Sequence, residues 1–273
     1  SKSGSFMTNV SVSNAAADNS YYIGVTNTHN DGHRYLEIQG GEWYANIAGG
    51  MGEDHAPNEP AFTFRMRGGA IRGSVYGAAA YAGAGGTRTY VITGGSIGGW
   101  VAGGANGTQS DGGLLDGATY IYVGGKARID SNGSTSVINR AVGGNVFGAG
   151  CGYGASSNSG QISLGTNVVV ADNAYIERGV YGGGSYGFTE ATSNLYVTGG
   201  TVDGKNGGVN GTTYQASITG GVFGGACQNR GGTVNITMTG GQVNGGMYGG
   251  SNVTGTIASS VTINVNGGQV GTS

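Results

Sequence analysis

Residues 235–252 read NITMTGGQVNGGMYGGSN, and the pattern of this stretch decides the fold of the chain. Apolar and polar side chains alternate as far as Thr239, a glycine pair follows, and much of the motif recurs within about ten residues. Alternation with a period of two indicates a β-strand with one buried face. The glycine pair allows positive φ and a tight corner directly after the strand. The stretch therefore predicts two strands joined by a sharp bend.

The same unit recurs along the chain when glycine pairs serve as markers. Ten copies begin their pair, or a degenerate equivalent of it, at Asn14, Gly40, Gly68, Gly94, Gly124, Asp172, Gly199, Gly220, Gly240 and Gly267. The residue two positions before the marker is apolar in every copy: Val12, Ile38, Met66, Ile92, Tyr122, Val170, Val197, Ile218, Met238 and Val265. Because the same position of each copy points inward at steps of about 20–30 residues, the repeat predicts parallel coils that stack in register. Neighbouring strands should lie about 4.8 Å apart. We therefore expect an all-β solenoid of about ten coils.

One step of the repeat is longer than the others, because Gly124 and Asp172 are 48 residues apart. We place an insertion at about residues 126–142, which can loop out of the stack; an eleventh, degenerate coil is the second interpretation. Residues 1–273 then form a single solenoid domain. Neither end shows a capping helix, so we expect a segment of a larger protein or end-to-end contact with further repeats.

Composition narrows the class of protein. Glycine supplies 63 of 273 residues, but two prolines and the lack of a Gly-X-Y period exclude collagen. A 37% apolar fraction argues against disorder. The net charge of −2 gives no reason to expect a nucleic-acid partner, and no apolar run approaches the roughly 18 residues of a membrane span. Glycine-rich runs lack the strand-turn-helix context of a dinucleotide site, so no cofactor is expected.

The two cysteines, Cys151 and Cys227, each stand four residues after an aromatic residue. The repeat places them three coils apart, or about 14 Å, whereas the Cα atoms of a disulfide lie within about 7 Å. We therefore expect two buried thiols rather than a disulfide.

Three units carry a resemblance to known proteins: residues 68–80 (GGAIRGSVYGAAA), 172–187 (DNAYIERGVYGGGSYG) and 239–252 (TGGQVNGGMYGGSN). They resemble the glycine-rich repeats of large bacterial surface proteins and, more loosely, the right-handed parallel β-helix (pectin-lyase-like) superfamily. The resemblance spans about residues 8–270 and implies a right-handed parallel β-helix in an extracellular or cell-surface protein of a bacterium. It also implies a structural or adhesive role, with a polysaccharide or host glycan as the partner. The superfamily includes polysaccharide lyases and glycoside hydrolases, so a carbohydrate-active enzyme is the alternative.

The histidines provide the first candidate site. His29, His33 and His55 fall in one window with several carboxylates, among them Asp31. Imidazole and carboxylate groups can bind a divalent metal or act as a general acid and base. His29, Asp31 and His33 are thus the metal-ligand candidates, although their spacing matches no zinc signature. Two polar loops on successive coils would explain the same residues without a site.

Outward-facing charges provide the second candidate. The register predicts Glu37 opposite Arg65, with Tyr35 and Arg67 beside them. A carboxylate, two guanidinium groups and a tyrosine could hold an acidic sugar. In the enzyme hypothesis, Glu37, Arg65 and His55 are the catalytic candidates. The alternative is a solvated ion pair of little energetic consequence.

Aromatic residues provide the third candidate. A ring that follows an inward residue should point outward and stack along the coils: Tyr76, Phe147, Tyr181, Phe223 and Tyr248. Together with Tyr35, Arg67, Trp43 and Trp100, Tyr76 is assigned to ligand binding, since sugars present apolar faces to aromatic rings. Alternatively, the rings shield the glycine backbone.

The leading hypothesis is a non-catalytic, adhesive solenoid, because the acidic residues are sparse and no pair recurs at a fixed offset in adjacent coils. A weaker, third hypothesis is ice binding by outward threonines. It rests on Thr93, Thr198, Thr219 and Thr239, but other residue types interrupt this row.

Overall fold

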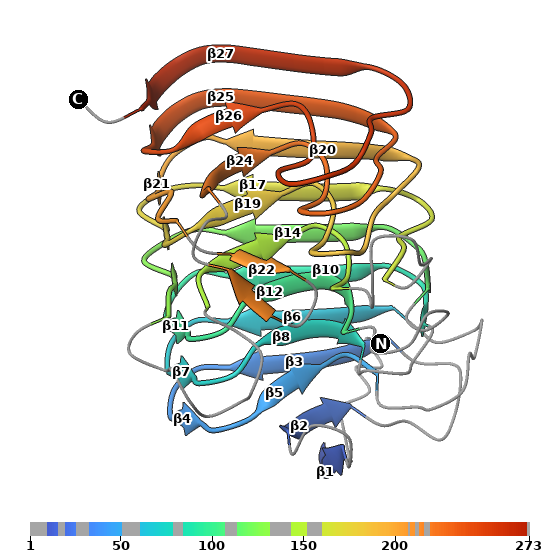
Figure 1. The fold of residues 1–273 in the computed structure, drawn as a ribbon. Helices are drawn as coiled ribbons and strands as arrows, with labels where there is room; N and C mark the ends of the chain where they lie inside the picture. The colour runs from blue at the N-terminus through green and yellow to red at the C-terminus, as the bar shows by residue number, and fades with distance from the viewer. Residues whose placement is uncertain are drawn as a thin grey trace, which may run out of the picture.

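The computed structural model describes residues 10–15, 20–25, 33–50, 61–78, 84–106, 114–131, 143–151, 160–206, 208–210, 213–215 and 219–271. Within these ranges the fold is all-β, and most strands belong to two large sheets of parallel strands (Figure 1). This arrangement is consistent with the predicted solenoid.

The long strands form one row that rises through the molecule, from β3 near the bottom of Figure 1 to β27 at the top. They are β3 (Arg34–Ile38), β6 (Phe62–Met66), β10 (Arg88–Ile92), β14 (Thr119–Val123), β17 (Thr166–Val170), β20 (Thr192–Val197), β25 (Thr233–Val243) and β27 (Val261–Val270). Neighbours pair in parallel and in register, so that Ile38, Met66 and Ile92 lie one above another. The predicted parallel stacking is confirmed for these strands.

A row of two-residue strands follows the glycine corners. It comprises β4 (Glu42–Trp43), β7 (Ala70–Ile71), β11 (Ser96–Ile97), β15 (Arg128–Ile129), β18 (Tyr175–Ile176) and β21 (Thr201–Val202), and the ends of β25 and β27 continue it. At the corner between β10 and β11, Gly95 has a φ of 79°, a conformation that favours glycine. The glycine pair therefore turns the chain as the sequence predicts.

The other large sheet carries the third side of each layer. Its strands are β2 (Ser20–Val25), β5 (Asn46–Ala48), β8 (Val75–Ala78), β12 (Val101–Ala105), β16 (Asn145–Phe147), β19 (Gly179–Tyr181), β24 (Gly221–Phe223) and β26 (Gly246–Tyr248), with β1 (Val10–Ala15) antiparallel to β2. Two small sheets pair β9 (Ala84–Gly85) with β13 (Leu115–Asp116), and β22 (Gly208–Asn210) with β23 (Thr213–Gln215).

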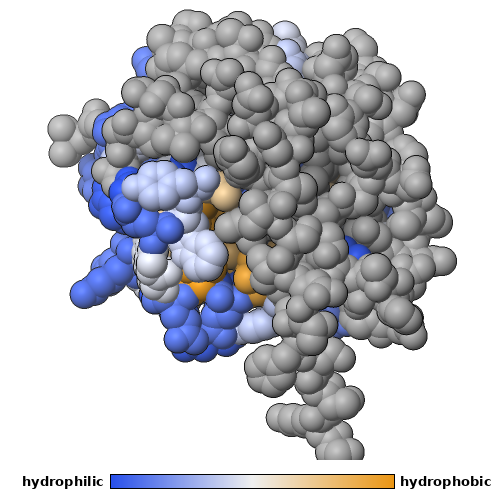
Figure 2. Space-filling model, turned by 90° about the horizontal axis from the view of Figure 1, so that it is seen from below, coloured by the Kyte–Doolittle hydropathy of each residue, from blue (hydrophilic) through white to orange (hydrophobic). Residues whose placement is uncertain are grey.

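The main core lies between the three rows of strands. Inward residues such as Ile236 and Met238 are fully buried there, while Thr237 between them is half-buried and faces outward. Each buried aliphatic or aromatic side chain stabilises the fold by about 1.5–3 kcal/mol. Seen from below, a small group of apolar residues is visible, with polar residues bordering it on the left and below (Figure 2). At the upper end, Val261, Ile263 and Val265 of β27 are exposed, and end-to-end contact there stays a prediction.

A row of glycines allows the layers to approach closely beside β8, β12, β16 and β19. A Cβ on Gly77 would lie 2.2 Å from the carbonyl oxygen of Gly103, and one on Gly103 would lie 2.2 Å from that of Gly148. Inward polar side chains bind the same row of carbonyls: the Thr119 hydroxyl donates to Gly148 O over 2.6 Å. These glycines are required because there is no space for a side chain.

The predicted inward residues are wrong in the coil that contains β14. Val123 is buried in the core, whereas Tyr122 faces outward. The corner after Val123 is one residue longer than most, so the glycine marker is shifted relative to the strand. In the next layer, Asp172 takes the left-handed conformation (φ 55°), and its carboxylate accepts hydrogen bonds from the Tyr122 hydroxyl and Gly125 N, both 2.8 Å.

Two of the ten copies differ from the prediction. The copy at Asn14 forms β1, which pairs antiparallel with β2 instead of stacking beneath β3. The pair at Gly220 leads into β24 of the other sheet, and Ile218 lies outside the described residues. Eight long strands therefore stack within the described part of the chain.

The insertion begins later than predicted. Lys126 follows the corner, and β15 is an ordinary member of its row, so residues 126–129 belong to the stack. Thirteen of the extra residues lie between Ile129 and Val146, which are 17 positions apart, whereas Ile97 and Val101 are four apart. Others follow Val146, because Val146 and Thr166 are 20 positions apart, whereas Val180 and Ser193 are 13 apart. Residues 132–142 lie outside the described ranges.

The aromatic rings stack along the layers, as predicted, but the expectation that they form an exposed platform is wrong. The stack runs through Tyr76, Trp100, Phe147, Tyr181, Phe223 and Tyr248, with neighbouring ring centroids 4.9–6.3 Å apart. All are buried except Tyr248. The rings cover the face of their sheet that points away from the main core, and residues beyond the strands, including Cys151 and Cys227, pack onto them. Tyr76 and Trp100 are therefore core residues rather than ligand-binding ones.

Neither cysteine forms a disulfide, as predicted. They are two layers apart, not three, because only the β19 layer separates the β16 and β24 layers. Burial raises the pKa of the Cys227 thiol to about 12, which disfavours the reactive thiolate.

Candidate functional site

The predicted charged cluster forms, with a different ion pair. Glu37 lies opposite Arg65 in the register, but its Oε1 atom accepts from Nε of Arg67 over 2.7 Å. The hydroxyl of Tyr35 donates to Oε2 over 2.6 Å, and Gln39 donates to Oε1 over 3.3 Å. The Tyr35 bond is the main cause that lowers the pKa of Glu37 below its ordinary value. An ionised carboxylate with these bonds is poorly suited to act as a general acid.

The structure describes only part of the predicted histidine and tryptophan sites. His33 is exposed, and its Nε2 atom lies 2.7 Å from the Thr63 hydroxyl. Among the described residues, no group of three or more His, Cys, Asp or Glu side chains could hold a metal ion. His29, Asp31 and His55 lie outside those residues, so the metal and catalytic assignments that include them stay predictions. Trp43 packs partly buried against the core, and its Nε1 donates to Gly40 O over 3.0 Å.

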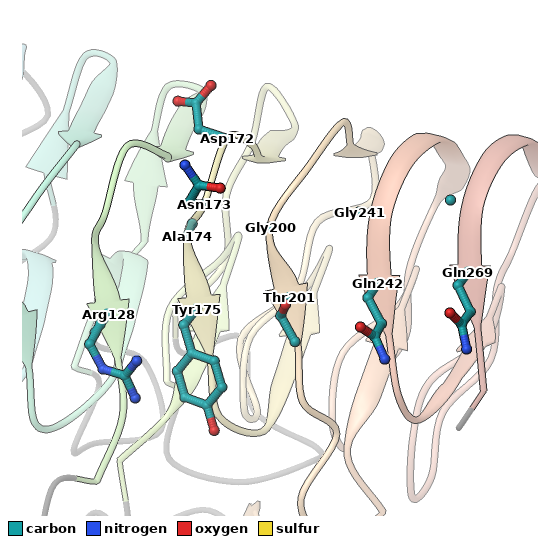
Figure 3. Close-up of a pocket in the computed structure, with 11 residues that line it drawn as sticks. Arg128, Asp172, Asn173, Ala174, Tyr175, Gly200, Thr201, Gly241, Gln242 and Gln269 are labelled. Carbon is teal, nitrogen blue, oxygen red and sulfur yellow. The ribbon is translucent and has the colours of Figure 1, made fainter. Parts of the chain in front are cut away.

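A groove of about 750 Å³ follows the glycine corners, in a region that the sequence analysis did not select (Figure 3). It is lined by Arg128, Asp172, Asn173, Ala174, Tyr175, Gly200, Thr201, Gly241, Gln242, Gly268 and Gln269. Figure 3 shows Arg128, Tyr175, Thr201, Gln242 and Gln269 side by side, each from a successive layer. We call these five residues the polar row.

Local sequence explains why the polar row faces the groove. In each layer the first strand residue after the corner points outward, and the next one, such as Val202 or Val243, points into the core. Side-chain alternation along a strand requires this difference. Gly200, Gly241 and Gly268 line the groove beside the row, and a Cβ on Gly241 would lie 2.6 Å from the carbonyl oxygen of Gly199 in the layer below. The residue after each glycine pair is therefore the signal that would have found most of this site.

Charged groups at the lower end of the groove bind each other. Nε of Arg128 donates to Asp130 Oδ2 over 2.8 Å, and its guanidinium carbon lies 4.2 Å from the ring centroid of Tyr175. The Tyr175 hydroxyl donates to Asp203 Oδ2 over 2.7 Å. Burial, followed by this bond, raises the pKa of Tyr175. These contacts connect three successive layers at this end of the polar row.

Acidic residues do align in adjacent layers, contrary to the sequence analysis. The offset from the glycine marker differs between them: six residues for Asp130, five for Glu177 and four for Asp203. A fixed offset therefore does not reveal these residues, but the strand register places them in one column. Nζ of Lys205 lies 3.4 Å from Glu177 Oε1 and 3.8 Å from Asp203 Oδ2. This ammonium group links the two carboxylates.

The pKa values of Glu177 and Asp203 both lie below their ordinary values. Burial raises the pKa of Glu177, but hydrogen bonds from Ser131 and the charges of Arg178 and Lys205 outweigh it. Burial likewise opposes the shift at Asp203, where hydrogen bonds from Tyr175 and other neighbours prevail. Acid–base hydrolysis requires one carboxyl group with a raised pKa beside an ionised one. These two groups do not form such a pair.

A Glu177→Gln variant is expected to lose less stability in acid than the wild type loses. Ionised Glu177 stabilises the fold above its unfolded-state pKa of about 4.3, and this contribution disappears as the pH falls through the lower folded-state value. Urea unfolding midpoints at about pH 7 and pH 3 measure the difference. Glu190→Gln is the control, because that carboxylate is 60% exposed. An acid-induced drop that is equal in Glu177→Gln and wild type would contradict the assignment.

Comparisons with known proteins supply no further assignment. The described residues include no helix with the length and apolar character needed to cross a membrane. The chain matches no family model, no curated protein and no solved structure.

Proposed function

We propose that this chain is a non-catalytic segment of a right-handed parallel β-helix in a bacterial surface or secreted protein, and that it binds a glycan in the groove beside the polar row. The parallel layers support the architecture. The resemblance of the glycine-rich units supports the location and the adhesive role.

The groove carries the ligand-binding part of the proposal. Small-molecule sites are concave and place a few polar groups at fixed positions. Hydroxyl and amide groups of Thr201, Gln242 and Gln269 stand there in successive layers of a regular sheet. Such groups both donate and accept hydrogen bonds, as sugar hydroxyls require.

The state of the described carboxylates supports binding rather than catalysis. Glu37, Glu177 and Asp203 all have lowered pKa values and are held by hydrogen bonds within the fold. The alternative, a polysaccharide lyase or glycoside hydrolase, relies on Glu37 and Arg65 together with His55.

A glycan array is expected to show binding by the wild type that Gln242→Ala weakens about tenfold. Loss of one hydrogen-bonding side chain costs about 1–1.5 kcal/mol, which corresponds to that factor. Gln39→Ala is the matched control, since Gln39 is exposed outside the groove, and it should bind like the wild type.

A reducing-sugar assay on the bound glycans distinguishes the enzyme hypothesis. The proposal expects no sugar release above buffer. Release that disappears in Glu37→Gln would establish catalysis and overturn the non-catalytic assignment.

A further inference from the structure

The geometry of the groove restricts the shape of its ligand. The polar row contributes one residue from each of five layers, from Arg128 in β15 to Gln269 in β27. Four steps of about 4.8 Å extend over roughly 19 Å along the stack. Figure 3 shows the row following this direction. A ligand that contacts the whole row must be elongated and lie parallel to the stacking direction.

The electrostatics of the groove restrict the charge of its ligand. Arg128 is paired with Asp130 and lies over the Tyr175 ring. The Asp172 carboxylate accepts hydrogen bonds from Tyr122 and from the Gly125 backbone. An acidic or basic sugar would therefore meet charges that already have partners, and would lose hydration without gaining a new ion pair.

Uncharged groups are the ones available for binding. No hydrogen bond within the described residues engages the Thr201 hydroxyl or the side-chain amide of Asn173. Gln242 donates through Nε2 to Asn244 Oδ1, which leaves its Oε1 open. Gln269 makes a long bond of 3.5 Å to Gly271 O. Thr201, Gln242 and Gln269 occupy the upper three layers of the groove, and Asn173 lies in the layer of Tyr175 below them.

We propose that the groove binds a linear, uncharged polysaccharide through several consecutive sugars aligned with the stack. This inference rests on the proposed glycan-binding function and specifies its ligand class. Each additional sugar reaches the polar side chain of another layer, so affinity should increase with chain length until the row is filled.

An array of length-defined oligosaccharides tests the inference. It should carry neutral series of gluco-, xylo-, manno- and galacto-oligosaccharides of two to six sugars, and a galacturonate series as the acidic counterpart. We expect affinity for one neutral series to increase at least tenfold from the disaccharide to the hexasaccharide. Equal affinity for both lengths, or tighter binding of galacturonates, would overturn this inference while leaving glycan binding intact. Binding of no glycan would instead remove the proposed function.

Variants at the groove test the alignment. Gln269→Ala and Thr201→Val should each lower affinity for the hexasaccharide several-fold, because a chain that is aligned with the row contacts both layers. Thr237→Val is the matched control, since this half-buried threonine faces outward elsewhere on the long strands. Unchanged hexasaccharide affinity in Gln269→Ala would show that the ligand does not follow the row.

Discussion

A Gly148→Ala variant should lose about 3 kcal/mol or more of its free energy of unfolding. The added Cβ would lie 2.3 Å from the carbonyl oxygen of Gly182 in the next layer and 2.9 Å from Cβ of Thr166. Overpacking usually costs about 1–3 kcal/mol, and a clash with backbone cannot be relieved by a change of rotamer. To make room, the layers would have to separate, which would also weaken the hydrogen bond from Thr119 to Gly148 O.

Urea unfolding followed by circular dichroism measures this loss. Gly40→Ala is the control, because a Cβ there meets nothing within 4 Å and Gly40 does not have positive φ. It should change stability by less than about 0.5 kcal/mol. If both alanine variants unfold at the same midpoint, close contact between layers is not what requires glycine at position 148.

A Tyr181→Ala variant should lose about 3–5 kcal/mol, the usual cost of removing a buried aromatic side chain. Its ring is only 1% exposed and stacks between Phe147 and Phe223, with centroid distances of 4.9 and 5.1 Å. Its hydroxyl also accepts a hydrogen bond from Asn252. The deletion would leave a cavity in the middle of the ring stack and leave that amide without one partner.

Tyr248→Ala is a control within the same stack. Tyr248 occupies the corresponding position two layers above, but it is 45% exposed and stacks on Phe223 on one side. We expect its removal to cost about 1 kcal/mol, because nearly half of its surface is already exposed to solvent and its ring has a neighbour on one side only. Equal losses in the two variants would contradict the view that the stack is an internal second core.

The sequence predicts the repeating part of the fold well because that part depends on neighbouring residues. Alternation in 235–239 indicates which side chains are buried, and the glycine pair that follows indicates the corner. The same reasoning places Glu37 opposite Arg65, as observed. It fails at Tyr122 because the glycine pair in this longer corner directly follows Val123, so the marker is shifted by one residue relative to the strand.

The candidate site could be predicted from the sequence only in part. The residue after each glycine pair identifies Thr201, Gln242 and Gln269, but it misses Arg128 and Tyr175, where the corner is longer. The opposite charges and the few histidines instead predict a site within residues 29–67. A groove forms from the space that the side chains of several layers leave unfilled. Its position therefore cannot be predicted from the sequence of a single coil.

The sequence by itself determined that the chain forms strands, that they stack in parallel, and that glycine turns the corners, because steric preference and side-chain alternation act within a few residues. Only the tertiary structure decided that the outward aromatic rings are covered and that Asp130, Glu177 and Asp203 share a column. The physical reason is that burial and alignment between layers depend on the lengths and paths of the connecting segments, which local sequence patterns do not encode.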